Sequence, residues 1–246
     1  MIVNIHKRSV LTTTGNETAM ASETSITPKQ IFADLSQDVI GQDQSLRDMS
    51  VAIFKHLIEH SSRNVLMIGN SGTGKTTVMR SIERFFTQTE GLDKYSTIIR
   101  INANLVADLA SSGKQTNVVM DRLARQAANI LGERADLDSM RKYVSHGIVC
   151  VDEVDKIRAV VGGVPNVKGI VAQDSLLTLM ENENVQVDLP YYDDGSWHSL
   201  TTTINTEHVL FVAGGAFEEL YDQVYQRVSK KSGSDKFWRL EPRADG

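Results

Sequence analysis

A glycine-rich stretch between an apolar run and a helix-like run constrains the fold of this chain most. Residues 69–77 read GNSGTGKTT, which contains the pattern Gly-x4-Gly-Lys-Thr, and they follow directly on the short apolar run 64–69. Residues 76–86 then carry apolar side chains at helical spacing. A strand, a glycine-rich turn and a helix in this order form the setting in which the pattern binds phosphate.

The residue types of this stretch suit phosphate chemistry. Glycines let successive backbone N–H groups turn toward phosphate oxygens, and the following helix adds the positive end of its dipole. Lys75 would reach the β- and γ-phosphates, and the Thr76 hydroxyl would ligate Mg²⁺. A turn that binds nothing is the alternative, and the complete pattern in this setting disfavours it. The expected nucleotide-binding residues here are Gly69, Asn70, Ser71, Gly72, Thr73, Gly74, Lys75, Thr76 and Thr77.

A second run supplies the carboxylates that a phosphate site needs. GIVCVDEVDK, residues 147–156, places Asp152 and Glu153 at the end of an apolar strand. In a parallel sheet, the carboxyl ends of the strands border the crevice where ligands bind. We expect Asp152 to hold Mg²⁺ through water, and Glu153 to orient and deprotonate the attacking water. The alternative is that two acidic residues merely end a strand at the surface.

The rest of the chain alternates between short apolar runs and longer helical patterns, which predicts an α/β fold with a parallel sheet covered on both faces. Thr27, Pro28 and Gln30 form a capping-box pattern that starts a helix, and a second helix covers 46–58. Two alternating segments around an Asp-Asp-Gly turn predict a β-hairpin in 183–205. Strands are expected at 64–69, 97–102, 147–153 and 208–214, and further helices at 76–86, 117–131, 170–182 and 216–228.

Composition narrows the function further. With 26 basic and 31 acidic residues the net charge is −5, which disfavours nucleic acid as a partner. No apolar run reaches the length of a membrane span. The single cysteine, Cys150, lies in an apolar run, where a buried packing role and a cytoplasmic location are expected. His56 and His60 could form a metal pair, but no third ligand is visible, which favours ordinary surface histidines.

Five runs resemble the AAA+ ATPases, and among them the ClpX/HslU-type protein unfoldases. These runs are DVIGQDQSLRDMSVAIFKHL, NVLMIGNSGTGKTTVMRSI, GIVCVDEVDKI, VAQDSLLTLMEN and VLFVAGGAFEEL. The resemblance implies a P-loop NTPase fold of the AAA+ large-domain type over residues 26–230, between a flexible arm at 1–25 and an irregular tail at 231–246. It also implies ATP and Mg²⁺ as cofactors, with Val39 and Ile40 against the adenine. By resemblance, the protein would form a homo-oligomer, a hexameric ring, that remodels a protein substrate with or without an adaptor.

The chain departs from that family in several places. Ser111, in LASSGKQ, stands where the first pore loop of the family carries an aromatic residue, and the neighbouring Lys114 would suit a polar or acidic polymer. One cysteine cannot build the zinc-binding domain of ClpX. The chain also ends before the family's arginine finger and small domain, so either a longer protein or a partner would supply them; Arg227, Arg239 and Arg243 are expected to be solvated charges.

Three functions are therefore open. The first is ATP-driven remodelling of a protein, and the second is a nucleotide-dependent switch or assembly factor that recruits a partner without threading it. The third, a DNA-associated ATPase, is disfavoured by the acidic charge balance.

Overall fold

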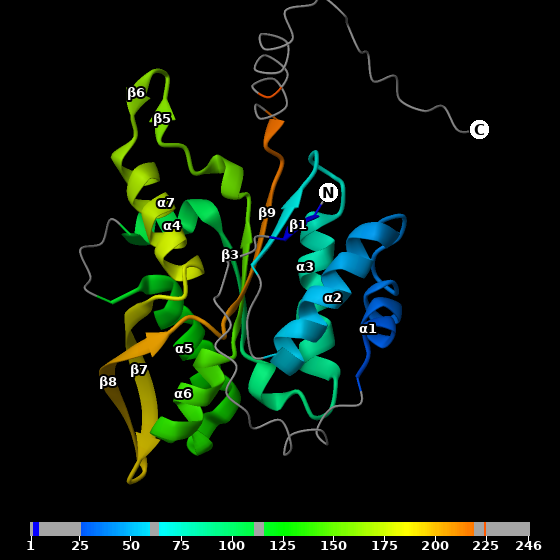
Figure 1. Ribbon diagram of the computed structural model, residues 1–246. Coiled ribbons are helices and arrows are strands. Elements are labelled where there is room, and N and C mark those ends of the chain that lie inside the picture. Colours follow the sequence, from blue (N-terminus) through cyan, green and yellow to red (C-terminus); the bar gives the residue numbers. More distant parts are fainter. Residues whose placement is uncertain (1, 5–25, 60–63, 111–115, 219–223, 225–246) are drawn as a thin grey trace, which may run out of the picture. The chain divides into compact units, whose positions relative to one another are not determined.

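The computed structural model describes residues 2–4, 26–59, 64–110, 116–218 and 224 (Figure 1). The chain divides into two compact units, Met1–Ala216 and Phe217–Gly246. In the second unit, Glu218 and Val224 are helical. The helix expected over 216–228 begins later than predicted, because Ala216 and Phe217 are not helical, and the other residues of that range lie outside the described residues. The expected tail at 231–246 lies outside them as well.

A five-stranded sheet organises the first unit, in the order β1-β2-β9-β4-β3. The four strands β2, β9, β4 and β3 are parallel to one another, as the alternating pattern predicted. Their carboxyl ends therefore share one edge of the sheet. The strands are β1 (Ile2–Asn4), β2 (Val65–Ile68), β3 (Ile98–Asn102), β4 (Ile148–Asp152) and β9 (Leu210–Gly215).

The first strand corrects the expectation of a flexible arm for its first residues. Ile2–Asn4 forms β1 and pairs antiparallel with β2, so that Asn4 lies opposite Val65. Three residues carry too little periodicity to separate a strand from a loop, because the pairing depends on a partner some 60 positions away. The rest of the range 1–25 lies outside the described residues.

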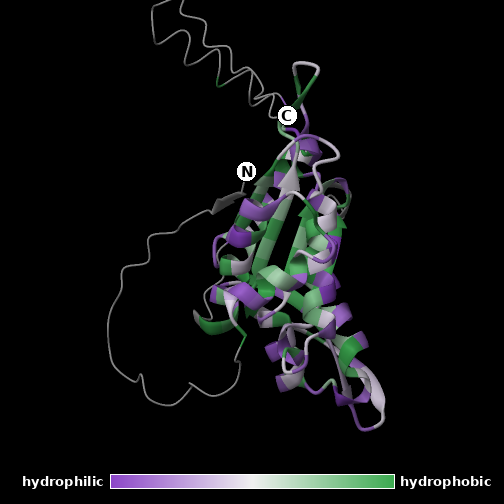
Figure 2. Cartoon of the chain, turned by 90° about the vertical axis from the view of Figure 1, so that its right-hand side faces the viewer, coloured by the Kyte–Doolittle hydropathy of each residue, from purple (hydrophilic) through white to green (hydrophobic). Residues whose placement is uncertain are grey.

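Helices cover both faces of the sheet (Figure 1). The inner strand β4 shows why: Ile148 and Cys150 pack into the cluster on one face, whereas Val149 and Val151 pack into the cluster on the other. All four are at most 2% exposed, so β4 has no polar face and reads as a continuous apolar run. Figure 2 shows the apolar strands between layers whose outer surface is more polar.

One layer contains α1 (Pro28–Leu35), α2 (Asp43–Glu59) and α3 (Lys75–Gln88). The capping box of α1 is present, with Thr27 and Gln30 bonding reciprocally. Arg84 on α3 pairs with Asp34 on α1 and with Asp38 in the turn after α1, each at 2.7 Å. The hydrogen bond from this cation lowers the pKa of the Asp38 carboxyl.

The other layer contains helices and two hairpins that follow β3 and β4. The expected hairpin is present, and Asp194 and Gly195 have positive φ angles of 47° and 78°, as a two-residue turn of type I′ requires. The helices α4 and α6 and the small hairpin β5–β6 were not predicted. The elements are α4 (Ala103–Ala110), α5 (Val118–Leu131), α6 (Leu137–Ser145), β5 (Val160–Val161), β6 (Val164–Pro165), α7 (Val167–Met180), β7 (Asn184–Asp193) and β8 (Ser196–Asn205). The described residues also contain three single 3₁₀ turns: η1 (Asp93–Tyr95), η2 (Gly132–Arg134) and η3 (Val154–Lys156).

Two further expectations concern single side chains. Cys150 is buried as predicted, and burial raises the pKa of its thiol to about 12, which suits packing and not redox chemistry. His56 is not a surface histidine: it is 1% exposed and meets Tyr95 edge to face at 5.2 Å. His60 lies outside the described residues, among which no group of metal ligands occurs.

The two-sided burial gives a stability prediction. Leu210 on β9 is 0% exposed, so Leu210→Ala should lower the free energy of unfolding by about 2–5 kcal/mol. The same substitution at Leu177 on α7, which is 56% exposed, should change it by less than about 0.5 kcal/mol. Urea denaturation of both variants tests this, and equal losses would contradict the assignment of the core.

Candidate nucleotide-binding site

Polar groups gather at the carboxyl edge of the sheet because four parallel strands end there. Ile68 lies opposite Gly215 across the β2–β9 pair, and Asn102 lies opposite Asp152 across the β3–β4 pair. The glycine-rich loop, the end of β9, the acidic turn after β4 and the last residue of β3 thus become neighbours. The structure therefore brings together residues that are far apart in the sequence.

The loop after β2 has the backbone geometry of an anion cradle. Gly72 and Gly74 have φ angles of 80° and 88°, a region that residues with a Cβ rarely adopt. Gly74 is also the N-cap of α3 and provides no side-chain cap. The N–H groups of the first helical turn therefore lack a side-chain acceptor, as is typical where a phosphate binds.

Lys75 places its ammonium group inside the loop. Its Nζ atom donates to the Gly69 carbonyl at 2.6 Å and to the Asn70 carbonyl at 2.9 Å. These two acceptors hold a positive charge beside the backbone N–H groups. The other expected loop residues form the exposed rim; they are Asn70, Ser71, Gly72, Thr73 and Thr77.

The expected cation ligands are in direct contact. The Thr76 hydroxyl, in the first turn of α3, donates to Asp152 Oδ2 at 2.6 Å. A hydroxyl and a carboxylate at this distance can both face one small divalent cation, for which oxygen is the preferred ligand. The two groups come from sequence positions 76 residues apart.

Glu153 is held by a residue that the sequence analysis missed. It adopts a left-handed backbone with a φ angle of 58°, and its Oε2 atom accepts a hydrogen bond from Asn102 Nδ2 at 2.6 Å. Positive φ at a non-glycine residue is uncommon and concentrates at functional sites. The available signal was a polar residue at the end of the apolar run TIIRIN, beside the strand that ends in Asp152.

A second missed residue connects the acidic turn to β9. Asp155 Oδ1 accepts the Ala216 N–H at 3.1 Å, and Gly69 N–H donates to the Gly215 carbonyl at 3.3 Å. The Gly215 carbonyl and the Ala216 N–H belong to one peptide group. That single group therefore joins the glycine-rich loop to the acidic turn.

An open pocket lies beside the loop. It has about 480 Å³ of space, including the open solvent at its mouth. Gln42 and Ser45, at the start of α2, line it together with the loop. Of the two residues expected at an adenine, Val39 is 4% exposed within the core, whereas Ile40 is 92% exposed.

This donor set suits a nucleotide phosphate with a divalent cation. Uncapped backbone N–H groups and Lys75 would hold the anion, and the oxygens of Thr76 and Asp152 would face the cation. A strand, a glycine-rich loop and a helix within a parallel α/β sheet, with an acidic strand tip against the helix, define the class of the P-loop NTPases.

The comparisons identify the family within that class. The chain belongs to the AAA domain family (Cdc48 subfamily), whose model matches residues 60–239. The chain is 28% identical to the ClpX ATP-binding subunit of the ATP-dependent Clp protease from Bacteroides thetaiotaomicron, over 82% of this chain and 48% of the relative. For the Azotobacter vinelandii subunit the identity is also 28%, over 89% and 50%.

The chain spans about half the length of the curated relatives it matches. The family match and the identity to ClpX subunits confirm the resemblance that the sequence motifs indicated. Among the helices that the structure describes, none is long and apolar enough to cross a membrane.

The Asp155 contact gives a testable prediction. Asp155→Ala should lower the free energy of unfolding by about 1–3 kcal/mol, because the Ala216 N–H loses its acceptor in a partly buried setting. Asp155→Asn keeps an oxygen acceptor and should lose less. Denaturant titration of both variants measures the difference. If the alanine variant is as stable as the asparagine variant, the peptide link does not stabilise this edge of the sheet.

Proposed function

We propose that this chain binds ATP with Mg²⁺ and hydrolyses it. The observation that carries the proposal is the 2.6 Å contact between the Thr76 hydroxyl and Asp152, directly below the glycine-rich loop. If Asp152 only ended a strand at the surface, its carboxylate would bond to water and not to a side chain in the first turn of α3. Membership of the AAA domain family supports nucleotide binding independently.

Each residue has a proposed role. Lys75 and the loop N–H groups, from Gly69 to Thr77, bind the phosphates. Thr76 and Asp152 face the cation, which would neutralise phosphate charge when bound. Glu153 orients and deprotonates the attacking water, and Asn102 fixes the direction of the Glu153 carboxylate. Val39, Ile40 and Gln42 lie on the segment that would meet the base, where Gln42 already lines the pocket.

We propose that a homo-oligomer of this chain uses ATP hydrolysis to remodel a protein substrate, as the similarity to ClpX subunits suggests. A feature of the chain supports a polypeptide partner. The hairpin β5–β6 exposes Val160, Val161 and Val164 by 55–65%, and no charged residue occurs between Arg158 and Lys168. Solvent-exposed apolar clusters of this kind mark interaction sites. The hairpin begins seven positions after Glu153 in the sequence.

The nucleotide roles can be separated by two substitutions. With ATP–Mg²⁺ at about a hundred times Kd, the wild type should gain roughly 2.7 kcal/mol of stability, visible as a rise in melting temperature. Glu153→Gln should keep this rise and lose at least about a hundredfold in turnover, because the phosphate cradle is intact and the base is not. Lys75→Ala should lose most of the rise. If Glu153→Gln hydrolyses ATP like the wild type, the assignment of Glu153 is wrong.

The polypeptide role depends on the β5–β6 hairpin. Replacing Val160, Val161 and Val164 by serine should leave the ATP-dependent melting shift intact but abolish any stimulation of turnover by an unfolded model protein. Val51→Ser, at a valine on α2 that is 44% exposed, serves as the control and should be stimulated like the wild type. ATP binding and partner capture without turnover, in the wild type, would instead indicate the nucleotide-dependent switch.

A further inference from the structure

The ribbon β7–β8 has one covered edge and one open edge. Its ten residue pairs run without interruption from Asn184 opposite Asn205 to Asp193 opposite Ser196. The edge of β7 that faces away from β8 forms hydrogen bonds with residues on or beside α5. The contacts are Asn117 N–H to the Gln186 carbonyl, Asp188 N–H to Asp121 Oδ1 and Tyr192 N–H to the Ala135 carbonyl, each 2.8 Å.

Within the part of the chain that the structure describes, the free edge of β8 has no such bonds. Among the described residues, no strand other than β7 pairs with β8, which lies on the outside of the molecule in Figure 1. Natural edge strands are usually short or carry a lysine, a proline or a bulge that prevents further pairing. The sequence of β8, SWHSLTTTIN, has ten residues, no lysine, no proline and an unbroken register. Its open backbone is therefore a template for another strand.

The hydrogen-bond pattern shows which residues of β8 face that edge. In an antiparallel pair, opposite residues alternate between bonding each other and directing their backbone groups away. Gln186, Asp188 and Tyr192 bond away from β8, so their partners Thr203, Thr201 and Trp197 direct their N–H and C=O groups toward the open edge. Pro190, which has no N–H to donate, occupies the same kind of position opposite Ser199.

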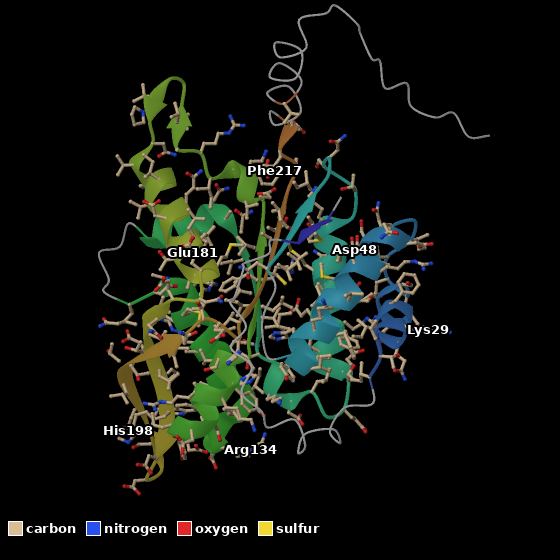
Figure 3. The ribbon with its side chains drawn as sticks, in the orientation of Figure 1. Lys29, Asp48, Arg134, Glu181, His198 and Phe217 are labelled. Carbon is tan, nitrogen blue, oxygen red and sulfur yellow. The ribbon has the colours of Figure 1, made fainter. Side chains whose placement is uncertain are left out.

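Aromatic and acidic side chains gather at the free end of the ribbon. Trp197 is 50% exposed and meets Tyr192 edge to face at 5.5 Å. Asp193 and Asp194 form the turn beside them, and between Lys168 and Arg227 the sequence contains no lysine or arginine. Arg141 reaches the ribbon from the inner side, where it donates to Thr202 Oγ1 at 3.4 Å. His198 lies near the free end of the ribbon in Figure 3.

We propose that the open edge of β8 binds an extended, lysine- or arginine-rich segment of a partner protein, which adds to the ribbon as a third strand. Backbone hydrogen bonds from 197, 199, 201 and 203 supply affinity, as in other cases of strand addition. The carboxylates and the exposed indole of Trp197 select cationic side chains through charge and cation–π contacts. A second copy of β8 is disfavoured as the occupant, because pairing two acidic ribbons would bring like charges together.

The test uses a labelled ten-residue peptide of alternating lysine and valine, followed by fluorescence anisotropy with the full chain. A peptide of alternating glutamate and valine is the charge control. The lysine peptide should bind and the glutamate peptide should bind at least tenfold more weakly. Raising the salt concentration from 50 to 500 mM should weaken the lysine peptide severalfold, since exposed charges are screened. Equal binding of both peptides would overturn the proposal.

Backbone variants test the mode of binding. Ser199→Pro with Thr203→Pro removes two N–H groups from the open edge but none from the pairing with β7, so binding should fall at least tenfold. Ser199→Val with Thr203→Val keeps both N–H groups and should bind like the wild type. Melting temperatures of both variants show that the ribbon is retained. Unchanged binding by a folded proline variant would overturn strand addition.

Side-chain variants test the selection of cations. Trp197→Ala, and Asp193→Asn with Asp194→Asn, should each weaken the lysine peptide severalfold. If neither does, the charge argument is wrong. Dimerisation of the wild type that the proline variant abolishes would make a second copy the occupant and overturn the proposal as well. Lys75→Ala should bind the peptide normally, so this inference and the proposed nucleotide role can fail separately.

Discussion

The position of β9 between β2 and β4 is the constraint on which the candidate site depends. Because β9 pairs in parallel with both neighbours, the glycine-rich loop after β2 and the acidic turn after β4 lie on either side of its end. The peptide group between Gly215 and Ala216 bonds to both. The same spacing lets the first turn of α3 reach across to Asp152. If β9 paired elsewhere, the two halves of the site would remain separate motifs.

Burial on both faces keeps that arrangement rigid. The inner strands have no polar face, so a shift of register by one residue would exchange the side chains between two packed layers. The candidate site therefore lies on a stable support: Lys75 and Thr76 are in the first turn of α3, Asp152 is the last residue of β4, and Glu153 follows it. Side chains placed in this way can change partners without loss of the core.

The two hairpins of the second layer have different surfaces. The β5–β6 hairpin is apolar, and the charged residues that flank it, Arg158 and Lys168, are basic. The β7–β8 ribbon is acidic, with the exposed indole of Trp197 and an open backbone edge. Surfaces of such different character suit different contacts. We assign the first to the proposed substrate and the second to a cationic partner segment, so that nucleotide chemistry, substrate contact and partner binding use separate parts of the fold.

The sequence alone determined the features that depend on local pattern. The glycine-rich loop, the capping box of α1, the apolar runs of the parallel strands and the Asp-Asp-Gly turn each carry their own signal, because backbone conformation and side-chain periodicity are local properties. Helix α6 also had a signal that was overlooked, since Asp136 caps it by accepting from Asp138 and Ser139. Contacts across the sheet had no such signal. Only the tertiary structure joined Asn102 to Glu153 and Asp155 to Ala216, buried His56, and added β1 to the sheet, because pairing between distant segments depends on strand order and register that no short window of sequence contains.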